Sequence, residues 1–276
     1  MNGPRPGLGW LHTVLESARQ TWWLALRDRL WWVVAAGVLV LPALTWLLAG
    51  RAREGVDGRS LYCVTAWWLL GIVVIPWLTL YLGVQAVHGR LEDRTFQYVF
   101  LRPVARSALL LGHWLAVVAM STLVAVVGAG ALMVGLAGRE PLWPDGVDWH
   151  LAWVFAYVLS AGAVVYAAVA VLFAAWFRRP LVWAAGFVVG VQTLAANLPV
   201  SAGMRQLTIT DPMRRMMLDA IEPDQRLARR LWPAEREFAL ELVEYPLRDL
   251  AVLLAVTLLL AIWAFGRTEY DSRDRE

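Results

Sequence analysis

The chain has 276 residues, of which 59% are hydrophobic and 17% charged, and its formal net charge is +3. A soluble globular domain is about half apolar and about a quarter charged, so this composition indicates a membrane protein. The modest charge is spread over loops without a basic cluster, which gives no reason to expect nucleic acid as a partner. All 25 basic residues are arginine. Because a P-loop needs a lysine on the nucleotide phosphates, this chain is not a P-loop ATPase by itself.

Residues 1–29 precede the first long apolar run and contain an amphipathic segment, Leu8–Leu26. Its polar residues Glu16, Arg19 and Gln20 lie off an apolar stripe with three- and four-residue steps. Next to a first span, this pattern predicts a cytoplasmic helix that lies in the membrane interface. The alternative is an ordinary solvated N-terminal helix. The stripe consists of Leu8, Leu11, Leu15, Ala18, Trp22 and Leu26.

Six charge-free apolar runs follow within residues 30–266. About 20 apolar residues are needed for a helix to cross roughly 30 Å of hydrocarbon, and five runs exceed that length while the last is near its lower limit. The pattern predicts an all-α, polytopic membrane protein with six transmembrane helices and a cytoplasmic tail at 267–276. The runs are Leu30–Gly50, Ser60–Gly89, Ser107–Gly138, Trp149–Phe177, Pro180–Met204 and Leu250–Gly266.

An even number of spans places both termini on one side of the membrane. Thirteen arginines then lie on that side, against four in the first two loops of the other side. By the positive-inside rule, both termini are predicted to be cytoplasmic. The third outside loop, 205–249, is long and rich in helix formers but is broken by Pro223, Pro233 and Pro246. We expect short helices there that cap the outer face, not a separate domain.

Chemistry-bearing motifs are sparse in the chain. No pair of its four histidines has metal-ligand spacing, and Cys63 is the only cysteine, so no catalytic or cofactor site is predicted. Met213, Met216 and Met217 are weak candidates for a copper(I) site because thioethers are soft ligands. Their alternative role is flexible apolar filler on an amphipathic turn. The spans contain no acid or arginine, which argues that any transport energy comes from outside them.

The connection between the second and third spans, residues 90–106, is polar and aromatic. Asp93 is placed to cap a short helix at Arg94–Leu101, in which Phe96 and Phe100 share a face, and Pro103 ends that helix. A simple reversal needs only a few polar residues. Exposed aromatics among charges therefore indicate a docking surface toward the cytosol. The alternative is that the aromatics anchor the loop in the interface.

This connection resembles that of the six-span type-2 ABC-transporter permeases. The matching features are an acidic pair, a threonine, an apolar helix, a proline followed by an arginine, and a glycine that opens the third span. Two residues depart from the pattern: Arg94 replaces a small residue, and His113 replaces a lysine. The turn Phe177–Pro180 and the segment Glu16–Trp32 are also similar to the family. The matches are Glu92, Asp93, Thr95, Phe96, the run Leu101–Arg106, and Gly112.

The resemblance implies a permease subunit that couples ATP hydrolysis by a separate ATPase to export of a substrate. Two permease chains, identical or different, would form a dimer in a bacterial inner membrane, with one ATPase subunit beneath each. ATP and Mg would be used by those ATPase subunits. The alternatives are a non-transporting scaffold for an ATPase and a membrane-embedded enzyme. The implied coupling residues are Glu92, Asp93, Arg94, Thr95, Phe96, Phe100, Arg102, Pro103, Arg106, Arg178 and Arg179.

Overall fold

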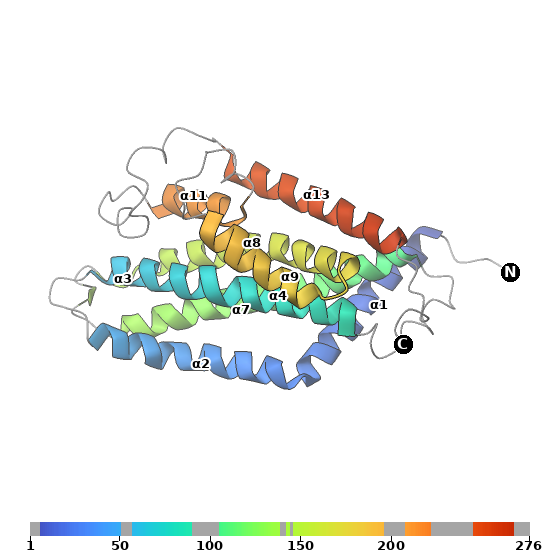
Figure 1. The fold of residues 1–276 in the computed structure, drawn as a ribbon. Helices are drawn as coiled ribbons and strands as arrows, with labels where there is room; N and C mark the ends of the chain where they lie inside the picture. Colours follow the sequence, from blue (N-terminus) through green and yellow to red (C-terminus); the bar gives the residue numbers. More distant parts are fainter. Residues whose placement is uncertain are drawn as a thin grey trace.

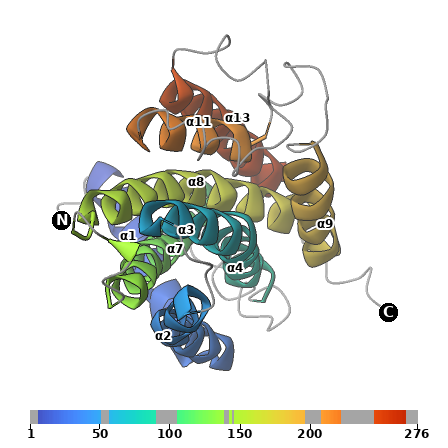
Figure 2. The same ribbon diagram turned by 90° about the vertical axis from the view of Figure 1, so that its left-hand side faces the viewer.

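The computed structural model describes residues 6–50, 57–89, 105–138, 142–143, 146–195, 208–221 and 245–267. Within these ranges the regular elements are all helical, as the sequence predicts. The long helices pack side by side in an elongated bundle (Figure 1), and Figure 2 shows the same bundle turned by 90°. The apolar runs and the helices agree to within a few residues. The prediction of an all-α membrane protein is therefore confirmed at the level of its elements.

The N-terminal helix α1, Pro6–Arg27, is followed by α2, Arg29–Gly50. The two helices meet at Asp28 and are bent by 72°, in agreement with an N-terminal helix that lies across the start of a span. On α1, Ser17 and Thr21 are buried, whereas Leu11 and Leu15 are 54% and 63% exposed. The helix thus packs its small polar side chains and the later part of its stripe, Ala18, Trp22 and Leu26, against the bundle and leaves the earlier part uncovered. Its place in the membrane interface stays a prediction.

The second apolar run forms one continuous helix from Gly58 to Gly89. It comprises α3 (Gly58–Thr65), η1 (Ala66–Val74), α4 (Ile75–Val84) and η2 (Gln85–Gly89), of which η1 and η2 are π-helical. The wide turns of η1 lead directly to Pro76, whose missing N–H interrupts the regular hydrogen-bond ladder. The side chain of Asp57 caps α3 by accepting from the N–H of Arg59.

The helices α7, Arg106–Ala137, and α8, Trp149–Trp176, form the centre of the bundle. Glycines on α7 let other helices approach closely. A Cβ on Gly112 would lie 2.5 Å from the carbonyl oxygen of Val14 in α1, and one on Gly135 would lie 2.5 Å from that of Pro42 in α2. Between them, Gly128 faces Leu70 of η1. Small residues at such crossings are typical of packing between membrane helices.

Three further helices cover α8. They are α9 (Pro180–Gly186), which continues into the π-helical η4 (Phe187–Ala195), then α11 (Thr210–Ile221) and α13 (Pro246–Arg267). The last helix begins at Pro246, four residues before the apolar run that starts at Leu250. Pro246 occupies the first helical position, where a missing N–H costs nothing. The bounds of the predicted loop 205–249 stay a prediction.

Four helices of the described chain are long and apolar enough to cross a membrane. They are Gly58–Val87, Arg106–Ala137, Trp149–Trp176 and Pro246–Arg267, and the bent pair α1–α2 brings the number to five. The fifth predicted span, Pro180–Met204, is represented by a shorter apolar helix at Pro180–Gln192, and its remainder extends beyond the described residues. The six-span count therefore stays a prediction.

The ends of the helices divide the bundle into two sides. The start of α1, the start of α7 and the end of α13 lie at one end of the bundle, on the right in Figure 1. Trp176 at the end of α8 and Trp263 of α13 bring their ring centroids within 5.7 Å, which places the α8–α9 turn there too. Helix α11 and the start of α13 lie toward the opposite end.

The close approach of α2 to α7 gives a direct test of the packing. We expect Gly135→Ala to lower the stability of the detergent-solubilised protein by about 1–3 kcal/mol, because its methyl group would overlap the backbone of Pro42 and the hydroxyl of Thr45. The measurement is the thermal unfolding midpoint. Gly130→Ala is the matched control, since a Cβ at Gly130 of the same helix meets nothing within 4 Å. Equal midpoints for the two variants would contradict this packing.

Candidate functional site

Of the eleven predicted coupling residues, the structure describes Arg106, Arg178 and Arg179. The remaining eight, from Glu92 to Pro103, lie outside the described residues, as does the predicted short helix Arg94–Leu101. Arg106 is exposed at the first position of α7 and donates from Nη1 to the carbonyl oxygen of Gly266 at 3.3 Å. This hydrogen bond ties the helix that leaves the 90–106 connection to the end of α13.

Arg178 and Arg179 are exposed in the turn between α8 and α9. Beside that turn, the guanidinium of Arg267 lies 4.4 Å from the ring centroid of Trp263, a cation–π distance. We call Arg106, Arg178, Arg179 and Arg267 the basic end of the bundle. The structure thus brings the three described coupling arginines to one end of the molecule, together with Arg267, which is not among the predicted coupling residues.

The opposite helix ends carry charges of both signs. Within the described chain, the basic end carries four arginines and no acid at the start of α7, the α8–α9 turn and the end of α13. At the other end, Asp57 and Arg59 lie at the start of α3, Asp148 caps α8 by accepting from the N–H of His150, and Arg248 and Asp249 lie in the first turn of α13. Acids at helix N-termini are electrostatically favoured, whereas a concentration of arginine is typical of a cytoplasmic face.

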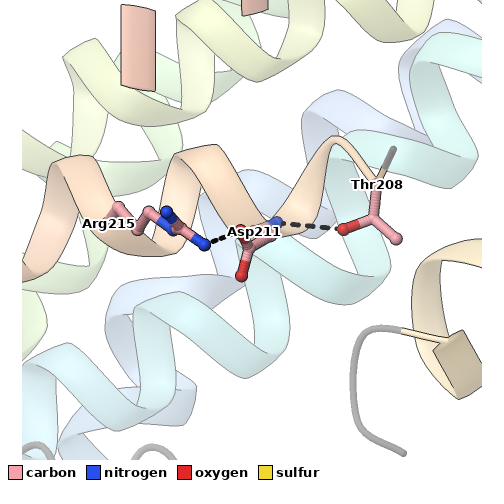
Figure 3. A network of polar contacts seen from close by, with 3 residues as sticks. All are labelled: Thr208, Asp211 and Arg215. Carbon is pink, nitrogen blue, oxygen red and sulfur yellow. Dashed lines mark hydrogen bonds and ion pairs between the residues drawn. The ribbon is translucent and has the colours of Figure 1, made fainter. Parts of the chain in front are cut away.

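Helix α11 carries buried charged side chains. Among the described residues, Asp211 and Arg214 are the charged side chains in the buried class, at 7% and 4% exposure. Oδ2 of Asp211 forms an ion pair with Nη2 of Arg215, one helical turn further on, at a distance of 2.8 Å. The N–H of Asp211 donates to the hydroxyl of Thr208 at 3.3 Å, which is an N-cap contact (Figure 3). Charges in an apolar bundle are costly and usually functional.

The start of α11 is held by a single oxygen atom. Oε1 of Gln192, in the η4 part of the fifth apolar run, accepts from the backbone N–H groups of Ile209 and Thr210, each at 3.2 Å. The same oxygen accepts from the hydroxyl of Thr210 at 2.7 Å and from that of Tyr166 on α8 at 3.3 Å. Because all five groups are buried, Gln192 fastens α11 to both α8 and η4. We call Gln192, Tyr166, Thr208, Thr210, Asp211, Arg214 and Arg215 the α11 cluster.

The three methionines of α11 lie on its buried face. Met213 and Met217 are 1% and 0% exposed and belong to the main apolar core, and Met216 is 8% exposed. Met213 fills the space that the missing side chain of Gly162 leaves on α8. These surroundings are those of packing residues. In the described part of the chain no group of three histidines, cysteines or acids is placed to hold a metal ion. The copper site stays a prediction.

Sequence reasoning missed the α11 cluster as a unit. Gln192 is noticeable as one of the few polar residues in the apolar runs, but its partners lie 17, 18 and 26 residues away, and no local pattern relates them. The one usable signal is Thr208 followed by Asp211, a spacing typical of a capped helix start. That signal predicts where α11 begins, but it does not predict which helices it contacts.

These features define a polytopic α-helical membrane protein with an arginine-rich end and a buried polar cluster toward the other. The sequence model described as "ABC-2 family transporter protein" matches residues 23–192, which is more than half of the chain. The chain therefore belongs to the ABC-2 transporter family and is a multi-pass membrane permease. The match begins near the end of α1 and ends in η4, so it includes the 90–106 connection and the α8–α9 turn. No curated protein matches the chain.

The role of Gln192 can be tested by removing its acceptor. We expect Gln192→Leu to release the start of α11, because two backbone N–H groups and two hydroxyls would lose their buried acceptor, at about 1–3 kcal/mol for each unsatisfied group. Hydrogen–deuterium exchange in residues 209–221 should become faster. Gln85→Leu is the control, since it removes an exposed glutamine from another apolar run. Unchanged protection in Gln192→Leu would show that other contacts hold α11.

The ion pair on α11 gives a separate prediction. Asp211→Asn removes the charge that compensates Arg215 and should lower the thermal unfolding midpoint, because a partly buried guanidinium is then left without its anion. Asp219→Asn is the control on the same helix, since Asp219 is exposed to solvent. A midpoint for Asp211→Asn that equals that of Asp219→Asn would mean that the pair contributes nothing to stability.

Proposed function

We propose that this permease is the membrane subunit of an ATP-driven exporter and receives its energy through the 90–106 connection. A separate ABC ATPase subunit docks against that connection and uses ATP and Mg, while this chain hydrolyses nothing itself. The predicted contacts are the aromatic and charged residues between Glu92 and Phe100, followed by Arg102, Pro103 and Arg106. Arg178 and Arg179 supply a second, smaller contact at the α8–α9 turn.

The observation that supports this proposal best is the arrangement at the basic end. The connection leaves η2 at Gly89 and returns at Arg106, so a partner that presses on it acts on the second and third apolar helices together. Arg106 also holds the end of α13 through Gly266, and the α8–α9 turn lies beside that end. A docked ATPase would therefore reach every helix that ends there. Arginine-rich ends suit partner surfaces that carry carboxylates.

The same arrangement supports a topology. We place the basic end in the cytoplasm, since arginine accumulates on that side of membrane proteins. Both termini are then cytoplasmic, α11 lies toward the outer face, and the fifth and sixth spans complete a six-span permease of a bacterial inner membrane. Two such permeases pair as a homodimer or heterodimer around the path of the exported substrate, with one ATPase subunit beneath each.

The docking step is tested by purification and by charge reversal. We expect a tagged permease to co-purify with a P-loop ATPase, and the double variant Glu92→Arg with Phe96→Ala to lose stimulation of ATP hydrolysis. The reason is that the variant removes both a charge and an aromatic contact from the docking helix. Asp219→Arg is the control, because it reverses an exposed acid of α11, which lies toward the opposite end.

The competing functions give different results in the same experiment. A scaffold would bind the ATPase, and hydrolysis would not respond to the double variant. A membrane-embedded enzyme would be fully active without any ATPase partner. Either result would overturn the proposed function.

A further inference from the structure

Helix α1 is fastened to the first two turns of α7 by a buried contact. Ser17 donates from Oγ to the carbonyl oxygen of Leu109 at 3.0 Å, and Thr21 Oγ1 lies 2.7 Å from Nδ1 of His113. Gly112 lies between these two contacts and allows the backbones of α1 and α7 to touch at Val14. We call Ser17, Thr21, Gly112 and His113 the α1–α7 clamp.

The clamp is closed to water. Ser17 and Thr21 are 4% and 3% exposed, and His113 is fully buried. The hydroxyl of Thr21 also lies 2.8 Å from the carbonyl oxygen of Ser17. Because a hydroxyl has one proton, a bond from Thr21 to Ser17 leaves His113 as the donor to Thr21 through Nδ1–H. Separating the helices would break the bond from Ser17 to Leu109 and the contact of Thr21 with His113, and loss of such buried polar contacts is costly.

The clamp lies close to the point where the 90–106 connection joins α7. Leu109 is three residues and His113 seven residues from Arg106, so both lie in the first two turns. The helix α1 joins α2 at the bend at Asp28, where the two helices are inclined by 72°. The N–H of Asp28 donates to Ala25 and the N–H of Trp31 donates to Asp28, which leaves a single residue between the two helices. Such a bend is the natural place for a change in angle.

We propose that α1 and the start of α7 move as one lever when the 90–106 connection is displaced, with the Asp28 bend as the joint to α2. Thr21 and His113 are positioning residues in this motion, since they act through α7 and not on a substrate. This inference rests on the proposed function, because the displacement comes from the ATPase. The competing arrangement is a fixed α1, past which α7 slides each time the clamp opens.

Distances between spin labels separate the two arrangements. In a Cys63→Ala background, which removes the only cysteine, one label pair is placed on Gln20 and Leu123, and a second on Gln20 and Val40. All three positions are exposed, on α1, α7 and α2 respectively. The permease is studied with its ATPase in lipid nanodiscs by pulsed electron paramagnetic resonance, without nucleotide and after trapping with ATP and orthovanadate.

We expect the α1–α7 distance to stay the same on trapping and the α1–α2 distance to shift. Thr21→Val, which keeps the side-chain shape without the hydroxyl, should broaden the α1–α7 distribution and abolish the α1–α2 shift. Thr21→Ser should restore both. Thr13→Val is the control, because its hydroxyl binds only within α1, to the carbonyl oxygen of Gly9. A change in the α1–α7 distance on trapping of the intact protein, or no change in either distance, would overturn the lever.

Failure of the proposed function gives a different result from failure of the clamp. If no ATPase associates with the permease, the proposed function fails and the trapping arm is lost. The clamp is then tested by measuring the α1–α7 distance distribution in the permease alone in nanodiscs. A broader α1–α7 distribution in Thr21→Val than in Thr13→Val supports the clamp, and equal distributions overturn it. Basal ATP hydrolysis of the complex should be unchanged in Thr21→Val, whereas a general folding defect would lower it together with the yield of the complex.

Discussion

The close approach of other helices to α7 is the constraint on which the bundle depends. In a membrane, helices gain little from burying apolar surface against each other, because lipid tails are equally apolar, so association relies on close packing and on hydrogen bonds between helices. Close packing along α7 depends on three glycines, Gly112, Gly128 and Gly135, which face α1, η1 and α2. A hydrogen bond between helices is the bond of 3.1 Å from the hydroxyl of Tyr62 to the carbonyl oxygen of Ala129 on α7.

This packing makes α7 the element that relates the two ends of the molecule. Its start adjoins the 90–106 connection and holds α13 through Arg106, and its Gly135 lies against α2 near the far end of that helix. The indole N–H of Trp114 reaches the carbonyl oxygen of Val164 on α8 at 3.3 Å. Because packed interiors transmit displacement and do not absorb it, a tilt imposed at the start of α7 must change the contacts of its neighbours.

The sequence predicts the elements well and their contacts poorly. The apolar runs locate the long helices because a membrane span needs an uninterrupted length of about 20 apolar residues. This requirement does not depend on which helices the span contacts. The arginine count likewise anticipates Arg106, Arg178 and Arg179 at one end. The α11 cluster and the α1–α7 clamp are not predictable in this way, since Gln192 and His113 each meet partners from distant parts of the chain. Single polar residues in an apolar run indicate that partners exist without identifying them.

The distribution of polar contacts gives the two ends different mechanical properties. At the basic end, the described arginines are exposed to solvent, so a partner can reach them at little cost of desolvation. Toward the other end, the start of α11 is held by three hydrogen bonds to Oε1 of Gln192, which also accepts from Tyr166 of α8, and the Asp211–Arg215 ion pair lies within α11 itself. Because the three bonds from the start of α11 share one acceptor, a displacement of Gln192 from that start breaks them together.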